Sequence, residues 1–145
     1  PLGCHFRLAA DDDAQIGLPE LDLGAVPAWG GSARLAKCVG ENHAMDMILR
    51  SKKISGKRAL EIGLVHEIYP IDELKDAAIA LGHELASQPA VAVASMMKVL
   101  VNSSEKNLDE LLIAERKAVH ENNNTKDSQE GMMAFLEKRK PQFNK

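Results

Sequence analysis

The scarcity of strand-like sequence is the feature that most constrains the fold of this chain. Only residues 4–10 and 64–69 alternate between apolar and polar side chains, and residues 15–17 add one short apolar piece. Two or three short strands do not make a sheet that is stable by itself. We therefore expect these strands to join others supplied from elsewhere, with a helix-rich C-terminal part acting as their cover.

Helical spacing of apolar residues accounts for most of the chain after residue 32, and we expect roughly six helices there. Ser32 and Ser55 are placed to accept the first free N–H groups of two of these helices. Asp127 and Glu130 have the spacing of a capping box ahead of a last helix that we expect from residue 131. Residues 90–104 are apolar around almost the whole circumference, which predicts a helix that is buried on several sides.

Charge and composition argue against several functional classes. The net charge of −3 disfavours a nucleic-acid-binding surface, and no apolar run approaches the ~20 residues that span a bilayer. The two cysteines, Cys4 and Cys38, do not form a C-x-x-C pair, and the five histidines are scattered. No secretory leader is visible in the sequence. We expect a cytoplasmic protein with reduced thiols, no metal site, and no nucleic-acid or membrane partner.

One glutamate stands in a segment made mostly of turns, IGLPELDLGAVPAWGGSARL at residues 16–35. Glu20 follows Pro19, which fixes the backbone ahead of it, and Gly17 and Gly24 permit tight turns on either side. A charged side chain in a loop is usually solvated, so the residues alone favour a surface glutamate.

Three motifs, in order along the chain, resemble the crotonase superfamily and particularly its enoyl-CoA hydratases. The first is FRLAADDDAQIGLPELDLGAVPAWGGSARL at residues 6–35, which is similar to the family's F/I-G-x-P-E and G-x-x-P-x-x-G-G pattern. The second is ISGKRALEIGLVHEIYP at residues 54–70, and the third is DSQEGMMAFLEKRKPQF at residues 127–143. The resemblance covers residues 4–143. It implies an α/β crotonase-like fold, a ββα spiral, of which this chain is the helix-rich C-terminal portion.

The resemblance also implies an organisation into two parts. Residues 1–70 would complete the spiral core and carry the catalytic-loop segment, and residues 71–145 would form a helical trimerisation region. A homotrimer or a dimer of trimers is expected. The oxyanion hole, much of the coenzyme A cleft and a second catalytic glutamate would lie in an N-terminal half that precedes residue 1, so this fragment alone is expected to be inactive.

The implied activity is the addition of water to a 2-enoyl-CoA thioester, as in fatty-acid β-oxidation, with no cofactor beyond the substrate's own coenzyme A. Glu20 matches the family glutamate that acts as one member of an acid/base pair. Ala28 stands where hydratases carry a glycine whose N–H holds the catalytic water. An alanine N–H can take this role without backbone strain only if the φ of Ala28 is negative. Trp29 is expected either to wall the acyl pocket or to pack in the core.

The C-terminal motif implies contacts with the nucleotide part of coenzyme A. Phe135, Lys138 and Arg139 are the candidates, and a solvated basic helix end is the alternative. Two departures from the family pattern stand out: His5 replaces a frequent aspartate, and Arg50-Ser51 replaces a frequent Thr-Gly. Two other functions stay open, an enoyl-CoA isomerase of the same fold and a non-catalytic RNA-binding or assembly protein.

Overall fold

The structure is a computed structural model that describes residues 1–11, 14–101 and 103–145. Part of the expected polar turn at residues 11–14 therefore lies outside the described residues. Within that range the chain divides into two compact units, Pro1–Ala80 and Leu81–Lys145. The expected boundary was ten residues earlier, at residue 70, and the trimerisation role of the second part stays a prediction.

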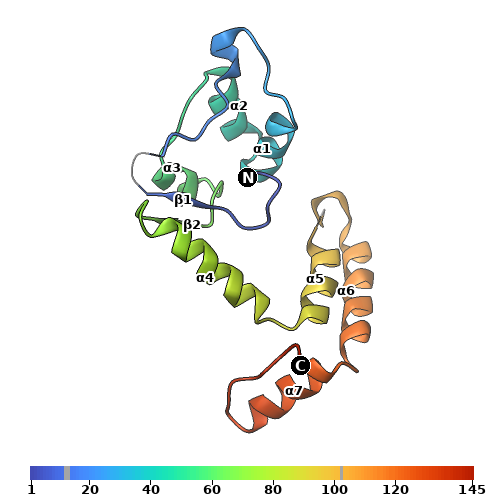
Figure 1. Ribbon diagram of the computed structural model, residues 1–145. Coiled ribbons are helices and arrows are strands. Elements are labelled where there is room, and N and C mark those ends of the chain that lie inside the picture. Colours follow the sequence, from blue (N-terminus) through green and yellow to red (C-terminus); the bar gives the residue numbers. More distant parts are fainter. Residues whose placement is uncertain (12–13, 102) are drawn as a thin grey trace. The chain divides into compact units, whose positions relative to one another are not determined.

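The first unit contains both strands of the described chain and the first three α-helices (Figure 1). Its elements are β1 (Leu8–Ala10), η1 (Glu20–Leu23), α1 (Gly31–Val39), α2 (Glu41–Leu49), α3 (Gly56–Glu61), β2 (Glu67–Tyr69) and the beginning of α4 (Leu74–Ala86). The second unit holds the end of α4, then α5 (Ala90–Leu100), η2 (Ser103–Glu105), α6 (Leu108–Asn122) and α7 (Lys126–Leu136).

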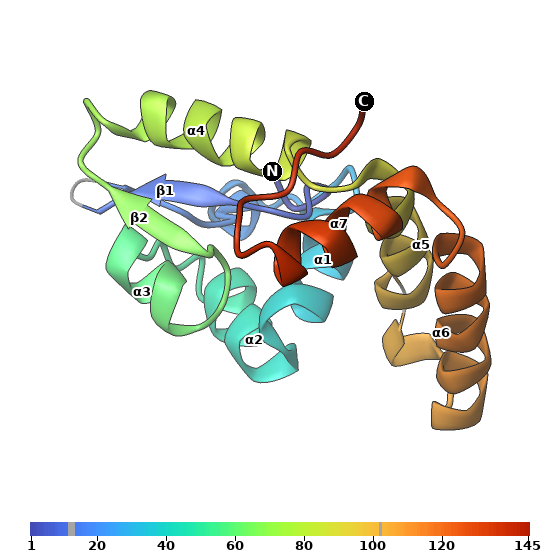
Figure 2. The same ribbon diagram turned by 90° about the horizontal axis from the view of Figure 1, so that it is seen from below.

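The two strands of the first unit pair in parallel. Leu8 lies opposite Glu67 and Ala10 opposite Tyr69. Figure 2 shows β1 and β2 side by side, with α3 next to β2. The strand expected at residues 4–10 is shorter than predicted, and the one expected at residues 15–17 is a single antiparallel bridge between Ile16 and Ile54. The core beneath them is made of small and medium aliphatic side chains: Ala9, Leu35, Val39, Ala44, Met47, Ile54, Ala59, Leu64 and Val65.

The helix starts confirm one predicted cap and correct two others. Ser55 caps α3, because its Oγ accepts a hydrogen bond from the Arg58 N–H at 3.2 Å. Ser32 caps nothing: α1 begins one residue earlier, after Gly30 in a left-handed conformation (φ 75°), so Ser32 already lies inside the first turn. The capping box predicted at Asp127 and Glu130 is also wrong, because α7 starts at Lys126.

The actual capping box belongs to α6. The Asn107 side chain accepts from the Glu110 N–H at 2.9 Å, and Glu110 accepts from the Asn107 N–H at 3.0 Å. The cap of α7 is Thr125, whose Oγ1 accepts from the Ser128 N–H at 3.1 Å. Both caps satisfy N–H groups that the first turn of a helix leaves free.

The second unit is built around α5 packed on α6. Ser95 and Val99 of α5 and Ala118 of α6 are buried there, and Ser95 Oγ donates to Glu121 at 3.2 Å. The expectation that α5 is buried on several sides is wrong within this chain, because α6 covers only one side of it. Four of its other apolar side chains are exposed: Val91 44%, Val93 42%, Met96 39% and Leu100 61%. None of the described helices is both long enough and apolar enough to cross a membrane.

Candidate functional site

The segment ahead of Glu20 is anchored on the chain that leads into α3. Ile16 and Ile54 exchange two backbone hydrogen bonds, of 3.0 and 2.9 Å. Gly17 then passes so close to this segment that an added Cβ would lie 2.8 Å from the Lys52 carbonyl oxygen. A side chain at position 17 would force the two segments apart, so glycine is needed for the close approach.

Glu20 is the first residue of the 3₁₀ helix η1, which fixes its backbone. Its carbonyl oxygen accepts from the Ala25 N–H at 3.0 Å, and η1 ends at Gly24 in a left-handed conformation (φ 68°). The helix contacts α2, which belongs to the core of the first unit. The carboxylate is therefore carried by a short, internally bonded turn and not by an open loop.

The Glu20 carboxylate is only partly accessible. Its Oε2 atom is buried and has no hydrogen-bond partner among the described residues. An unpartnered buried acceptor costs about 1–3 kcal/mol, and more when it is charged. A fully solvated surface glutamate, the interpretation favoured by the residues alone, does not have this environment.

The turn before α1 leaves the backbone N–H groups of Ala28, Trp29 and Gly30 without a hydrogen bond to a described residue. Ala28 is exposed and has a negative φ, as an alanine requires, whereas Trp29 has a φ of 57° and Gly30 a φ of 75°. The Ala28 carbonyl accepts from the Gly31 N–H at 3.0 Å, and Arg34 Nη1 donates to the Trp29 carbonyl at 2.9 Å. In the described part of the chain, the Ala28 N–H itself makes no hydrogen bond.

Trp29 does not pack in the core of this chain. Its exposed fraction is 98%, so the core-packing interpretation fails for the described residues. Leu23 and Val26 of the same segment are also exposed, so Trp29 is one of several uncovered apolar side chains there. The turn thus presents an unbonded N–H at Ala28 and an uncovered indole at Trp29, both in the unit that contains Glu20.

A cavity of about 420 Å³ opens in the first unit next to this loop. Gly17 and Leu18, shortly before Glu20, belong to its wall, but Glu20 does not. The rest of the wall is mostly aliphatic and includes Leu8, Ile16, Leu35 and Met47. Because Leu35 and Met47 of the wall also belong to the hydrophobic core, the cavity borders the core of the first unit.

The C-terminal candidates lie on a turn with a specific helix-ending geometry. The Lys138 N–H donates to the Phe135 carbonyl at 3.2 Å, and the Arg139 N–H donates to the Ala134 carbonyl at 3.0 Å. Together with a φ of 55° at Lys138, these bonds form a Schellman motif. The left-handed position usually holds glycine, since an L-residue there costs about 1–2 kcal/mol.

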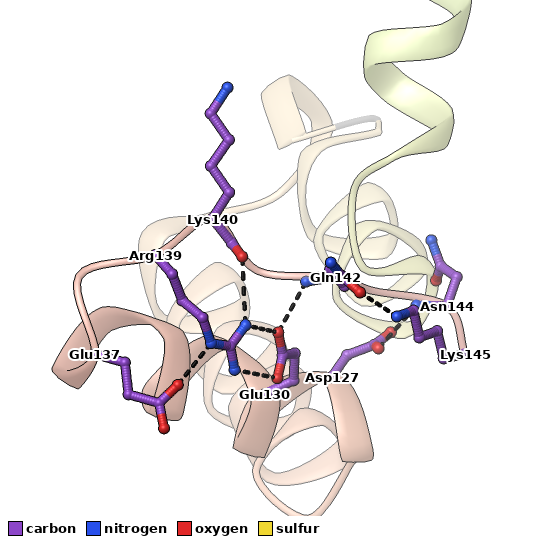
Figure 3. A network of polar contacts seen from close by, with 8 residues as sticks. All are labelled: Asp127, Glu130, Glu137, Arg139, Lys140, Gln142, Asn144 and Lys145. Atoms are coloured by element: carbon purple, nitrogen blue, oxygen red, sulfur yellow. Dashed lines mark hydrogen bonds and ion pairs between the residues drawn. The ribbon is translucent and has the colours of Figure 1, made fainter.

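Arg139 is held between two carboxylates (Figure 3). Its Nη1 and Nη2 donate to the two carboxylate oxygens of Glu130 at 2.6 and 2.8 Å, and its Nε donates to Glu137 at 2.6 Å. The bonds from Arg139, and then the one from the Gln142 N–H at 2.9 Å, lower the pKa of Glu130 to about 2. Glu130 first, and then Glu137, raise the pKa of the Arg139 guanidinium further above its usual value.

The segment after this turn folds back over the helical unit. The Asn144 N–H donates to Asp127 Oδ1 at 2.9 Å, and its side-chain Nδ2 donates to the carbonyl of Gln88 at 2.8 Å. Its Oδ1 accepts from the Ala90 N–H, the first residue of α5, at 3.0 Å. Asn144 therefore ties the start of α7 to the α4–α5 connection, and no local sequence pattern predicted this.

The structure thus separates the candidate residues into two groups. Glu20, Ala28 and Trp29 belong to the first unit, and Phe135, Lys138 and Arg139 belong to the second. Phe135 is 79% exposed and Lys138 is also exposed, but the guanidinium of Arg139 is already bonded within the chain. Arg139 is therefore ion-paired while still exposed to solvent, and its contact with coenzyme A stays a prediction. The described residues hold no group of three or more His, Cys, Asp and Glu side chains that suits a metal ion.

Comparison with known proteins gives a consistent result. The sequence model of the enoyl-CoA hydratase/isomerase family matches residues 2–145. A probable enoyl-CoA hydratase of Bacillus subtilis is 40% identical over 144 residues, which is 98% of this chain and 55% of the relative. The mitochondrial enoyl-CoA hydratase of Pongo abelii is 37% identical, over 97% of this chain and 50% of its own length. The 2,3-dehydroadipyl-CoA hydratase of Escherichia coli is 34% identical, over 97% and 57%.

Solved structures show the same likeness. An enoyl-CoA hydratase from Geobacillus kaustophilus superposes with a TM-score of 0.90 at 34% identity, covering 99% of this chain and 54% of that one. An enoyl-CoA hydratase from Bacillus anthracis gives 0.90 at 35% identity, covering 98% and 55%. The expected crotonase-like fold is confirmed, and the chain spans about half the length of the relatives it matches.

Proposed function

The chain belongs to the enoyl-CoA hydratase/isomerase family, and on this premise we propose that the complete protein adds water to a 2-enoyl-CoA thioester with Glu20 as one acid/base group. The observation that carries the proposal is the buried Glu20 Oε2 without a partner. A carboxylate with one buried and unbonded oxygen is suited to hold a water molecule or to exchange a proton with a ligand.

Hydration of the double bond has three requirements. A water molecule must lose a proton as it attacks the β-carbon, the α-carbon must gain one, and the negative charge on the thioester oxygen must be stabilised. Glu20 would accept the hydrogen bond of the water and move one of these protons. A second carboxylate and the N–H groups of the oxyanion hole would come from residues that the relatives carry ahead of the matched region.

Ala28 and Trp29 would complete the water and acyl side of the site. The unbonded N–H of Ala28, with its negative φ, can donate to the oxygen of the water held by Glu20. The uncovered indole of Trp29 would form a wall against the acyl chain. No cofactor is needed in this scheme, because the thioester already draws electrons from the double bond.

Phe135 and Lys138 would contact the nucleotide part of coenzyme A, since both are exposed and Lys138 makes no ion pair within the described chain. The exposed apolar side chains of α5 support assembly into a homotrimer or a dimer of trimers, because such a surface is normally covered in solution.

The test is Glu20→Gln in the complete protein, assayed by hydration of crotonyl-CoA. We expect activity to fall by about 10²–10⁴-fold, the usual contribution of an acid/base group, with the circular dichroism spectrum unchanged. Asp22→Asn is the matched control, because Asp22 is an exposed carboxylate on the same 3₁₀ helix. Wild-type turnover in Glu20→Gln rejects the role.

An isomerase is the second candidate, because the matched family includes isomerases and one carboxylate suffices to move a proton between two carbons of an enoyl chain. The two activities are separated by supplying a 3-enoyl-CoA. A protein that converts it to the 2-enoyl isomer without forming the 3-hydroxy product is an isomerase. Binding of RNA without any binding of coenzyme A favours the non-catalytic alternative.

A further inference from the structure

The backbone from Ala28 to Gly31 forms a tight turn whose conformation is unfavourable for its sequence. The Ala28 carbonyl accepts from the Gly31 N–H at 3.0 Å, and the φ values of the two residues between them are 57° at Trp29 and 75° at Gly30. Positive φ at both central positions is characteristic of a type I′ turn, which prefers asparagine, aspartate or glycine there. A tryptophan in the left-handed region is a backbone outlier, and such outliers persist only where the surrounding structure holds them.

The side chain of Arg34, in the first turn of α1, reaches back to hold this conformation. Its Nη1 donates to the Trp29 carbonyl oxygen at 2.9 Å, and this carbonyl accepts no backbone hydrogen bond within the described residues. The Gly30 N–H, which belongs to the same planar peptide group, is likewise without a bond to a described residue. Among the described residues, Arg34 is therefore the one group that fixes the orientation of the Trp29–Gly30 peptide.

Gly30 provides the space in which the guanidinium lies. A Cβ added at Gly30 would collide with Arg34 Nη1, and it would lie 3.2 Å from Cζ and 3.7 Å from Nη2 of the same side chain. The guanidinium thus lies directly against the Gly30 backbone, where any larger residue would displace it. The hydrogen bond to Trp29 and the close approach to Gly30 are two separate contacts of one arginine with the same turn.

The turn also packs against the segment that carries Glu20. A Cβ added at Gly31 would lie 3.4 and 3.5 Å from the two methyl carbons of Leu18, so the Leu18 side chain rests on the backbone at the end of the turn. Leu18 is two residues ahead of Glu20, and Gly17 before it is packed closely against Lys52. Because the Glu20 segment is anchored in this way, a change in the turn would move Ala28 relative to Glu20.

We propose that Arg34 is a positioning residue, which holds the Trp29–Gly30 peptide so that the Ala28 N–H stays directed at the water molecule bound by Glu20. The proposal rests on the proposed function, because it takes that water as the reacting group. Arg34 does not touch the substrate in this scheme and acts only through the turn. A donor that is already in place before the reaction stabilises developing charge without having to reorganise.

The experiment is a series of substitutions at position 34 of the complete protein, with kcat per folded enzyme and KM for crotonyl-CoA hydration as readouts. Arg34→Met removes every donor and is expected to lower kcat about tenfold, the effect of one charge-assisted hydrogen bond, while KM stays within about twofold of wild type. Arg34→Lys keeps a charged donor and should recover most of kcat, and Arg34→Gln should fall between the two. Ser32→Ala is the control and should behave as wild type, because Ser32 lies in the same helical turn and caps nothing.

The decisive result is the combination with Glu20→Gln, in which the water has lost its base. If Arg34 acts through that water, adding Arg34→Met to Glu20→Gln lowers kcat much less than Arg34→Met does alone. An equal further loss, or a wild-type kcat in Arg34→Met, overturns the positioning role and leaves the proposed function intact. A lower stability in urea without a lower kcat shows a role in folding only and overturns it as well. If Arg34→Met does not fold, a kcat for Arg34→Lys no higher than that for Arg34→Gln overturns the role. A wild-type protein that does not hydrate crotonyl-CoA overturns both proposals.

Discussion

Replacing Ser51 by glycine should stabilise the protein, although it removes a side chain. Helix α2 ends in a Schellman motif: the Ser51 N–H donates to the Ile48 carbonyl at 3.1 Å and the Lys52 N–H donates to the Met47 carbonyl at 2.8 Å. This places Ser51 in the left-handed region, with a φ of 49°. The family pattern has glycine at this point, so the Arg50-Ser51 departure seen in the sequence has a physical cost.

The magnitude follows from two opposing terms. Leaving the left-handed strain gains about 1–2 kcal/mol. The greater conformational freedom of glycine in the unfolded chain lowers the free energy of unfolding by about 0.5–1 kcal/mol. No hydrogen bond from the Ser51 side chain to a described residue is lost, so the net gain should be about 0.75 kcal/mol at the midpoints of the two ranges and at most about 1.5 kcal/mol.

The assay is urea-induced unfolding of wild type, Ser51→Gly and Ser51→Ala, followed by circular dichroism. Ser51→Ala removes the hydroxyl but keeps a Cβ in the strained conformation, so it should not gain stability. Ser51→Gly should have a higher midpoint at an unchanged slope. The reasoning fails if Ser51→Gly is no more stable than wild type, or if alanine stabilises as much as glycine.

Two further predictions concern the helical unit. Asn107→Ala should destabilise the protein by about 1 kcal/mol in the same unfolding assay, because it breaks the capping box of α6. Asn123→Ala, at the other end of that helix, is the control. Equal losses of stability in the two variants would contradict the role of Asn107 as a cap. The pKa of Glu130 is lowered to about 2 in the folded chain, so its bonds contribute stability above the ordinary glutamate pKa near 4.5, and this contribution is lost as the pH falls towards 2. Unfolding between pH 5 and pH 2 measures this loss, which should disappear in Arg139→Gln; an unchanged pH dependence in that variant would refute the assignment.

Local sequence signals predicted the parts of the fold that depend on neighbours in the chain. The Ser55 cap and the amphipathic helix from residue 108 were predicted because serine capping and helical periodicity act within a few residues. The α7 cap was missed because the helix begins five residues earlier than its apolar spacing indicated, at Lys126 in place of residue 131. The extent of β1 was overestimated because strand length depends on the partner, and β2 provides only three residues.

In the candidate sites too, the residues could be named from the sequence, but the contacts they make could not. The identity of Glu20 as a candidate came from the resemblance, but its buried, unpartnered oxygen depends on the tertiary structure and no local pattern predicts it. The resemblance implies that Arg139 contacts the nucleotide part of coenzyme A, and this stays a prediction. Its ion pair with Glu130, nine residues away along the chain, was not predicted, because the two residues meet only where the segment after α7 folds back. A contact between residues this far apart in the sequence leaves no periodic pattern, so sequence analysis could not predict it.

The parallel pairing of β1 and β2 sets an order on how the first unit assembles. Around this pair, Arg7 and His66 hydrogen-bond to each other across 59 positions of sequence. Closing the loop between Arg7 and His66 is slower and costs more entropy than bringing α1 into contact with α2, its immediate neighbour in the chain. During synthesis, β1 therefore leaves the ribosome three helices before β2, and until β2 follows, the backbone groups that bond to β2 in the folded unit are hydrogen-bonded to water.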